Sequence, residues 1–364
     1  MRFKLSFLSL LVLLFSIHCT SDNRQDQAQS GSSWIKPEAG NQVNLGEKVD
    51  LQIQVNDSAT VDSVVYFADG KRLVSGEGTK QTQIETQNLT LGNRLITATI
   101  YRKGQQEEIN TNIILKSNLV PQKFAYKVQQ VFNHDTSSYT QGLEYHNGFF
   151  YESDGGNTPE TGYSSLRKVE PATGKVLQKV DFPAPFFAEG LTLVDDKIIM
   201  LTWQQNIGLV FDRNSLKQLS EFPYQNSRQG WGLCSDNKRL YKSDGTNLIY
   251  FLNRENYREE GYIEVYDHKG PVEELNELEL IDGKIYANVY NTDRIVIINP
   301  KSGQVTGEIN MSDLLPAIYK YPDTDVLNGI AWDAKGKRLF ITGKRWAKLF
   351  QVEIFPQSNS LTVR

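Results

Sequence analysis

A short unit that recurs along the latter part of the chain decides its fold. It first occurs as Gln141-Gly142-Leu143, a polar or aromatic residue followed by a small or acidic one and an aliphatic one. It returns at intervals of about 42 to 52 residues, a spacing typical of propeller blades. The other occurrences are Glu189-Gly190-Leu191, Trp231-Gly232-Leu233, Asn276-Glu277-Leu278 and Asn328-Gly329-Ile330. Five such units predict five blades.

Each unit continues into further strands. Turn residues such as Asn147-Gly148 and Asp282-Gly283 lead from the first strand to a second one. A fourth strand is recognisable in every unit except the last, so we predict that segment 126–132, which alternates apolar and polar residues, supplies the missing outer strand and closes the ring. We predict second strands at 149–153, 198–203, 239–243, 285–290 and 338–343, and third strands at 165–170, 208–212, 248–253, 295–299 and 348–354.

The region before the repeats has a different pattern. Short alternating runs at 49–55, 63–67, 95–101 and 112–115 are separated by Gly, Asn and Asp turns. They predict a small immunoglobulin-like β-sandwich over residues 34–117, in which we find no pattern of catalytic residues. The expected fold is therefore all-β, with this sandwich preceding a five-bladed β-propeller at 122–356.

The N-terminus reads as an export signal. Met1-Arg2-Phe3-Lys4 is followed by an apolar run at 5–17 that is too short to span a bilayer. The run ends near Cys19, which a polar stretch follows, so we expect a lipoprotein signal peptide at 1–19, a lipid on Cys19 and a polar linker at 20–33. His18 stands where a small residue is usual, which leaves plain cleavage and an uncleaved anchor as alternatives. We expect an exported protein, lipid-anchored in a bacterial cell envelope.

Composition excludes several function classes. The net charge of −4 gives no basic footprint for nucleic acid. Beyond Cys19 the only cysteine is Cys234, so no intrachain disulfide can form, and we expect a small buried side chain there. The glycines of the repeats precede strands rather than helices and form no phosphate loop. We expect no metal and no cofactor, because His134, His146 and His268 are scattered, and we expect a monomer.

The repeat itself predicts a site. In an antiparallel pair with a tight turn, the start of one strand lies beside the end of the other. Residues at these positions should therefore meet at one mouth of the channel, where aromatic groups and single charged groups favour a small-molecule pocket. Three structural readings remain open: the polar groups satisfy backbone atoms, Glu189 and Lys344 form a plain ion pair, or the tryptophans pack between blades. The predicted mouth residues are Gln141, Glu189, Trp231, Asn276, Asn328, Trp203, Asp244, Tyr290 and Lys344.

The same positions carry a resemblance to a known family. The order and spacing of the motifs over about residues 122–356 closely resemble the plant-type glutamine cyclotransferases. This resemblance implies a metal-free, five-bladed propeller enzyme that converts the N-terminal glutamine of peptides or proteins into pyroglutamate and releases ammonia. The motifs include Tyr139-Thr140-Gln141-Gly142-Leu143, Phe187-Ala188-Glu189-Gly190-Leu191, Gly230-Trp231-Gly232-Leu233, Leu275-Asn276-Glu277-Leu278-Glu279 and Thr342-Gly343-Lys344-Arg345-Trp346.

The resemblance also implies a role for each residue. Glu189 corresponds to the catalytic carboxylate, which moves a proton as base and then as acid. Lys344 and Asn276 correspond to groups that stabilise the oxyanion and hold the γ-amide. The expected substrate-binding residues are Gln141, Asn328, Tyr139, Phe187, Trp203, Trp231 and Tyr290. Two rival hypotheses are a non-catalytic propeller that binds peptide N-termini at the cell surface and a metal-dependent propeller hydrolase such as a lactonase.

Overall fold

The computed structural model describes residues 31–357 apart from residues 57, 77–78 and 159–161. Over this range the regular structure consists of β-strands and two single-turn 3₁₀ helices, Ser58–Thr60 and Ala317–Tyr319. The prediction of an all-β protein is therefore confirmed. Neither of these short helices is long and apolar enough to cross a membrane. The predicted signal peptide and Cys19 lie outside the described residues.

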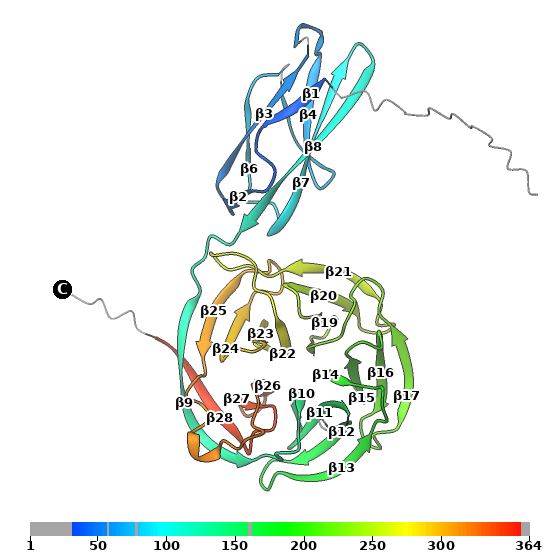
Figure 1. The fold of residues 1–364 in the computed structure, drawn as a ribbon, viewed down its shortest axis with the longest axis vertical. Helices are drawn as coiled ribbons and strands as arrows, with labels where there is room; N and C mark the ends of the chain where they lie inside the picture. The colour runs from blue at the N-terminus through cyan, green and yellow to red at the C-terminus, as the bar shows by residue number, and fades with distance from the viewer. Residues whose placement is uncertain (1–30, 57, 77–78, 159–161, 358–364) are drawn as a thin grey trace, which may run out of the picture.

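The first eight strands form two sheets at one end of the molecule (Figure 1). Leu51 and Ile53 of one sheet share a buried apolar cluster with Tyr66, Ile96 and Ile113 of the other. The four predicted strands are confirmed as β3, β4, β7 and β8, whereas the four shorter ones were not predicted. One sheet has the order β1 (Ser32–Lys36), β3 (Lys48–Val55), β6 (Thr82–Glu85), and the other β2 (Asn41–Asn44), β8 (Gln105–Lys116), β7 (Gly92–Arg102), β4 (Ser63–Ala68), β5 (Lys71–Gly76).

Five four-stranded antiparallel units follow, and each opens at one of the predicted repeats. The first is β10 (Thr140–His146), β11 (Phe149–Thr158), β12 (Gly162–Glu170), β13 (Lys175–Asp181), and the second β14 (Ala188–Val194), β15 (Lys197–Thr202), β16 (Ile207–Asp212), β17 (Gln218–Pro223). The third is β18 (Leu233–Ser235), β19 (Arg239–Ser243), β20 (Leu248–Asn253), β21 (Glu259–Glu264), and the fourth β22 (Leu275–Ile281), β23 (Lys284–Val289), β24 (Arg294–Ile298), β25 (Val305–Asn310). The fifth combines β26 (Leu327–Asp333), β27 (Arg338–Gly343) and β28 (Lys348–Pro356) with β9 (Gln122–Asn133) from before the first unit.

The innermost strands of the units form a closed ring, because β10 contacts β14 and β26, and β18 and β22 complete the contacts between them. Glycine explains how closely these strands approach. A Cβ at Gly142 would collide with the backbone of β14, one at Gly190 with the backbone around Trp231, and one at Gly232 with the carbonyl of Asn276. In these three units the glycine in the middle of the repeat is therefore required by packing against the next unit, whereas the fourth unit has Glu277 at this position.

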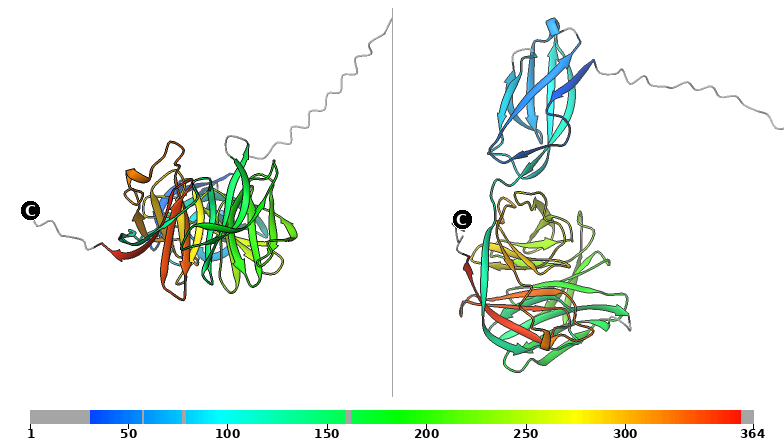
Figure 2. Two further views of the ribbon diagram at one scale, coloured as in Figure 1. Left: turned by 90° about the horizontal axis from the view of Figure 1, so that it is seen from below. Right: turned by 60° about the vertical axis from the view of Figure 1, so that its left-hand side comes forward.

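Strand β9 closes the ring, as predicted, but it does so with both of its edges. It pairs antiparallel with β28 from Asn133↔Lys348 to Phe124↔Pro356. Its first residues, Gln122 to Phe124, also pair in parallel with Gly307 to Ile309 of β25. The fourth and fifth units thereby join into one eight-stranded sheet. Figure 2 shows that the segment leaving the N-terminal sheets continues directly into this strand.

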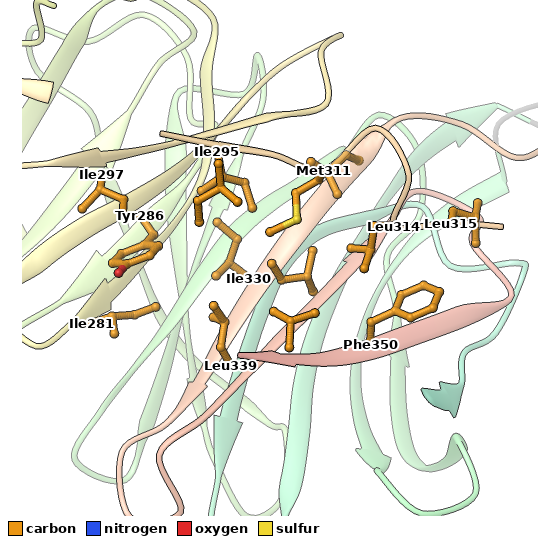
Figure 3. Packing of buried hydrophobic residues seen from close by; sticks show 14 of the residues in the cluster. Ile281, Tyr286, Ile295, Ile297, Met311, Leu314, Leu315, Ile330, Leu339 and Phe350 are labelled. Carbon is orange, nitrogen blue, oxygen red and sulfur yellow. The ribbon is translucent and has the colours of Figure 1, made fainter. Parts of the chain in front are cut away.

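The units are held together by apolar clusters between their faces. In the largest, Tyr286 and Ile295 of the fourth unit meet Ile330 and Leu339 of the fifth (Figure 3). Met311, in the connection between the two units, caps the same cluster. Burying such side chains contributes about 1.5–3 kcal/mol each. These clusters fix the orientation of the inner strands and so the positions of the residues at the mouth.

Candidate active site

The first strand of most units contains a β-bulge, which turns one polar side chain toward the site. The register of β10 against β11 shifts between Thr140 and Gly142, and similar shifts occur in three other units. Each shift leaves an extra residue on the first strand, and a bulge of this kind re-aims a side chain. The residues inside the shifts include the polar residues that open four of the repeats, namely Gln141, Glu189, Asn276 and Asn328.

Nine of the ten predicted binding and catalytic residues line one pocket of about 250 Å³. Pockets for drug-sized ligands measure about 300–1,000 Å³, so this one suits a smaller group such as one amino-acid residue. Asn328 does not line the pocket and lies behind it, fully buried. Asp244 is outside it as well and accepts a hydrogen bond from the Thr246 hydroxyl at 2.6 Å. The nine lining residues are Tyr139, Gln141, Phe187, Glu189, Trp203, Trp231, Asn276, Tyr290 and Lys344.

Glu189 is the one carboxyl group among the residues that line this pocket, and it is 4% exposed. Gln141 Nε2 donates a hydrogen bond to its Oε1 at 3.3 Å, and Asn328 Nδ2 lies 3.4 Å from the Gln141 amide oxygen. Burial raises the pKa of Glu189 well above its usual range, although Lys344 opposes the shift. The direction of this shift, which the sequence left undecided, is therefore upward.

Lys344 lies just after β27 and is 2% exposed. Its Nζ stands over the rings of Tyr139 and Tyr290, at 4.6 and 4.9 Å from their centroids. Burial lowers the pKa of Lys344 to about 8, although Glu189 and Asp325 oppose this shift. Within the described part of the chain this ammonium makes no ion pair closer than 4.0 Å. The interpretation of Glu189 and Lys344 as a plain ion pair is therefore wrong.

Aromatic rings form the walls of the pocket. Phe187 packs edge-on against both Tyr139 and Trp203, with centroid distances of 6.3 and 5.6 Å. Trp231 packs edge-on against Tyr290 at 5.5 Å. All five rings are only partly buried, and they line the pocket rather than the spaces between the sheets. Their flat, apolar faces suit a planar amide and exclude water from it.

Asn276 adds an acceptor that has no partner. It is 2% exposed, and its Oδ1 is buried without a hydrogen bond among the described residues. Buried polar atoms are normally paired. This oxygen is closed off from the pocket space, so Asn276 can offer a ligand its amide nitrogen as a hydrogen-bond donor.

Two features near the site were not predicted as such. Strand β11 extends to Thr158 instead of ending at 153, and its last residues pair with Gly162 and Tyr163 of β12. Gln229, which the sequence analysis did not single out, contacts two of the pocket walls. Its position two residues before Trp231 is its only signal in the sequence. Cys234 is 2% exposed, and burial raises the pKa of its thiol, which confirms the predicted buried role.

Comparison with known proteins identifies the families that the two parts of the chain resemble. The family model described as glutamine cyclotransferase matches residues 95–354, and a bacterial Ig domain model matches residues 32–98. A glutaminyl-peptide cyclotransferase of Arabidopsis thaliana is 40% identical over 229 residues, which cover 61% of this chain and 69% of that protein. The crystal structure of Myxococcus xanthus glutaminyl cyclase is similar, with a TM-score of 0.59 and 29% identity over 65% of this chain and 99% of that one.

The chain therefore belongs to the glutamine cyclotransferase family, because the family model covers well over half of it. The N-terminal sheets match a separate family, that of bacterial immunoglobulin-like domains.

Proposed function

We propose that this chain is a glutaminyl-peptide cyclotransferase, an aminoacyltransferase that converts the N-terminal glutamine of peptides or proteins into pyroglutamate. One observation carries the proposal: a buried carboxyl group with a raised pKa, Glu189, lies in a residue-sized aromatic pocket together with a lysine. Family membership and the Arabidopsis relative support the same activity.

We also propose that the ring of five units is a five-bladed β-propeller and that the site lies at one mouth of its channel. The five inner strands and the closure through β9 support this reading. The proposed domain boundaries are 34–117 for the immunoglobulin-like domain and 122–356 for the propeller. Export, the lipid on Cys19 and the monomeric state belong to the same proposal and rest on sequence.

In the reaction the substrate's α-amine attacks the carbonyl carbon of its own side-chain amide. A carbon–nitrogen bond forms and closes the five-membered lactam, and the bond to the amide nitrogen breaks to release ammonia. Nucleophile and electrophile belong to one residue, so the pocket contributes by holding the side chain in the folded rotamer. The rings of Trp203, Trp231 and Phe187 line the space in which the flat amide would be held.

Glu189 moves the proton in this mechanism. As a carboxylate it takes a proton from the attacking amine, and as an acid it returns the proton to the departing nitrogen. A free α-amine has a pKa of about 7.7–8.0, so a carboxyl group whose pKa is raised by burial is better matched to it than an ordinary glutamate. Gln141 holds Glu189 through its amide N–H, and Asn328 in turn holds Gln141.

Lys344 stabilises the oxyanion that forms on the amide oxygen, because its ammonium lies in the same pocket and no anion of the described residues lies within ion-pair distance of it. Asn276, which also lines the pocket, donates from its amide nitrogen to the substrate amide oxygen. Proton transfer and charge stabilisation are then both supplied by side chains. The proposed chemistry therefore uses no metal and no cofactor.

The direct test is ammonia release from a dipeptide that begins with glutamine, measured with the purified protein. A dipeptide that begins with glutamate is the control, because it offers a carboxylate in place of the amide. We expect ammonia to be released from the glutamine dipeptide and not from the glutamate dipeptide. Tight binding of the glutamine peptide without ammonia release would instead favour a peptide-binding protein.

A further inference from the structure

The aromatic wall of the pocket consists of two arcs with a polar group at each join. One arc is formed by Tyr139, Phe187 and Trp203, and the other by Trp231 and Tyr290. Lys344 stands at the first join, over the two tyrosine rings. The second join lies between the two tryptophans, and Gln229 occupies it.

Gln229 holds both tryptophans through a single atom. Its Oε1 accepts a hydrogen bond from Trp203 Nε1 and another from Trp231 Nε1, each at 2.8 Å. These bonds use both lone pairs of the amide oxygen, and an indole N–H can only donate. Each indole is thereby fixed in its rotation as well as its position. Among the described residues, Gln229 is the acceptor for both of these N–H groups.

The backbone of Gln229 is also held in place by hydrogen bonds. Its carbonyl oxygen accepts a hydrogen bond from Lys242 Nζ, which also donates to Ser227 Oγ at 2.6 Å. Lys242 is fully buried on β19, with its ammonium 4.2 Å from the centroid of the Tyr224 ring. The loop between β17 and β18 is therefore tied to the sheet directly behind the two indoles.

We propose that Gln229 is a positioning residue for the cyclisation, an inference that rests on the proposed function. By holding the two indoles at a fixed separation, it sets the width of the slot in which the substrate amide lies against the pocket walls. A slot of fixed width favours the folded rotamer in which the amine reaches the amide carbon. Gln229 acts through Trp203 and Trp231 and needs no contact with the reacting atoms.

The test replaces the shared acceptor and keeps the length of the side chain. Gln229→Met removes the acceptor, whereas Gln229→Glu retains an oxygen that accepts both indole N–H groups. Gln225→Met is the matched control, because Gln225 lies in the same loop and its side chain bonds to Glu259 N and to the Pro223 carbonyl, at 2.7 Å each, instead of to an indole. Steady-state kinetics on the glutamine dipeptide are measured together with quenching of tryptophan fluorescence by acrylamide and with the melting temperature.

For Gln229→Met we expect kcat/KM to fall by about 10²-fold, the cost typical of a small misplacement of reacting groups. Most of the loss should be in kcat, with increased quenching and a nearly unchanged melting temperature. Gln229→Glu should recover most of the activity and the protection from quenching. Gln225→Met should match the wild type.

Wild-type kcat in Gln229→Met would overturn the proposal, as would an equal loss in Gln225→Met, because that would indicate a general effect of the loop. Absence of recovery in Gln229→Glu, despite restored protection from quenching, would overturn it as well. Failure of the proposed function would give a different result from failure of this proposal. The wild type would then release no ammonia, while acrylamide quenching would still report whether Gln229 holds the two indoles.

Discussion

Two regions of the ring each bury a lysine, Lys242 on strand β19 and Lys344 just after β27, and the two lysines have different surroundings. Burial lowers the pKa of both Lys242 and Lys344 to about 8. Both ammonium groups also lie over two tyrosine rings. Lys242, however, donates hydrogen bonds to Ser227 and Gln229, whereas Lys344 stands in the pocket wall.

The comparison teaches that burial and a shifted pKa do not identify a functional lysine by themselves. What separates the two is the set of hydrogen bonds the protein makes to each ammonium. A buried charge that the protein satisfies internally contributes to structure, and one that faces a pocket is available to a ligand. The predictions below test this distinction.

The largest effect is expected at the carboxyl group that faces Lys344. Glu189→Gln keeps size and polarity but cannot move a proton, so kcat should fall by about 10²- to 10⁴-fold with little change in substrate affinity or melting temperature. Single-turnover kinetics with the glutamine dipeptide provide the measurement. A variant that keeps more than about a tenth of the wild-type kcat would show that another group carries the proton.

The two lysines themselves should respond in opposite ways to the same substitution. Lys344→Met should lower kcat by at least about 10²-fold through loss of oxyanion stabilisation, without lowering the free energy of unfolding. Lys242→Met should lower the free energy of unfolding by about 1–3 kcal/mol, because it removes the donor to the Gln229 carbonyl and to Ser227 Oγ, which keeps only its hydrogen bond to Glu259. Urea unfolding and steady-state kinetics are measured for both variants. Equal losses of stability would show that the two lysines do not differ in their structural role.

The pH dependence of kcat/KM sharpens the role of Lys344. Glu189 must be ionised to accept a proton, so activity should fall as the pH drops below its raised pKa. Lys344 must be protonated, so activity should also fall as the pH rises through about 8. In Lys344→Arg the cation persists to higher pH. The fall in kcat/KM at alkaline pH should therefore begin at a higher pH in this variant. If it begins at the same pH as in the wild type, a group other than Lys344 is responsible for it.

A smaller effect is expected from a chelator. If Glu189 and Lys344 supply the proton and charge chemistry, exhaustive treatment with a chelator should leave turnover of the glutamine dipeptide unchanged. Loss of turnover that added zinc restores would contradict the proposed mechanism.

The smallest effect on catalysis is expected at Cys19. Cys19→Ala should release the protein from the membrane fraction and leave its kcat unchanged, because the anchor takes no part in the pocket. Fractionation of cells that express the variant gives the answer. Continued retention in the membrane would point to a different anchor.

Much of the fold could be predicted because the repeat is a packing requirement visible in the sequence. Gly142, Gly190 and Gly232 mark three places where inner strands approach too closely for a Cβ. The recurrence of the whole repeat, which has Glu277 in its fourth copy, indicates five units. In the N-terminal sheets the long alternating strands were predicted, but β2 and β6 were not. With four residues each, they carry too few alternations for a pattern to be recognised.

The pocket residues could be predicted from their places at strand ends, but not the bulges that aim them, because a bulge depends on register with a partner strand. Gln229 was missed for a similar reason: it lies in an irregular loop, and its two indole partners are apparent only in three dimensions. The pKa of Glu189 is raised by burial and lowered by the charge of Lys344. Which effect is larger depends on how far apart the two groups lie and how much solvent reaches them, and the sequence shows neither.

Ring closure through β9 has a consequence for how the chain folds. The partners Asn133 and Lys348 are 215 positions apart in sequence, and contacts between such distant segments form slowly because a long loop must first close. During synthesis β9 emerges before every strand of the ring and β28 after all the others that are described. We therefore expect the ring to complete itself last, with an open strand edge on β9 until it does.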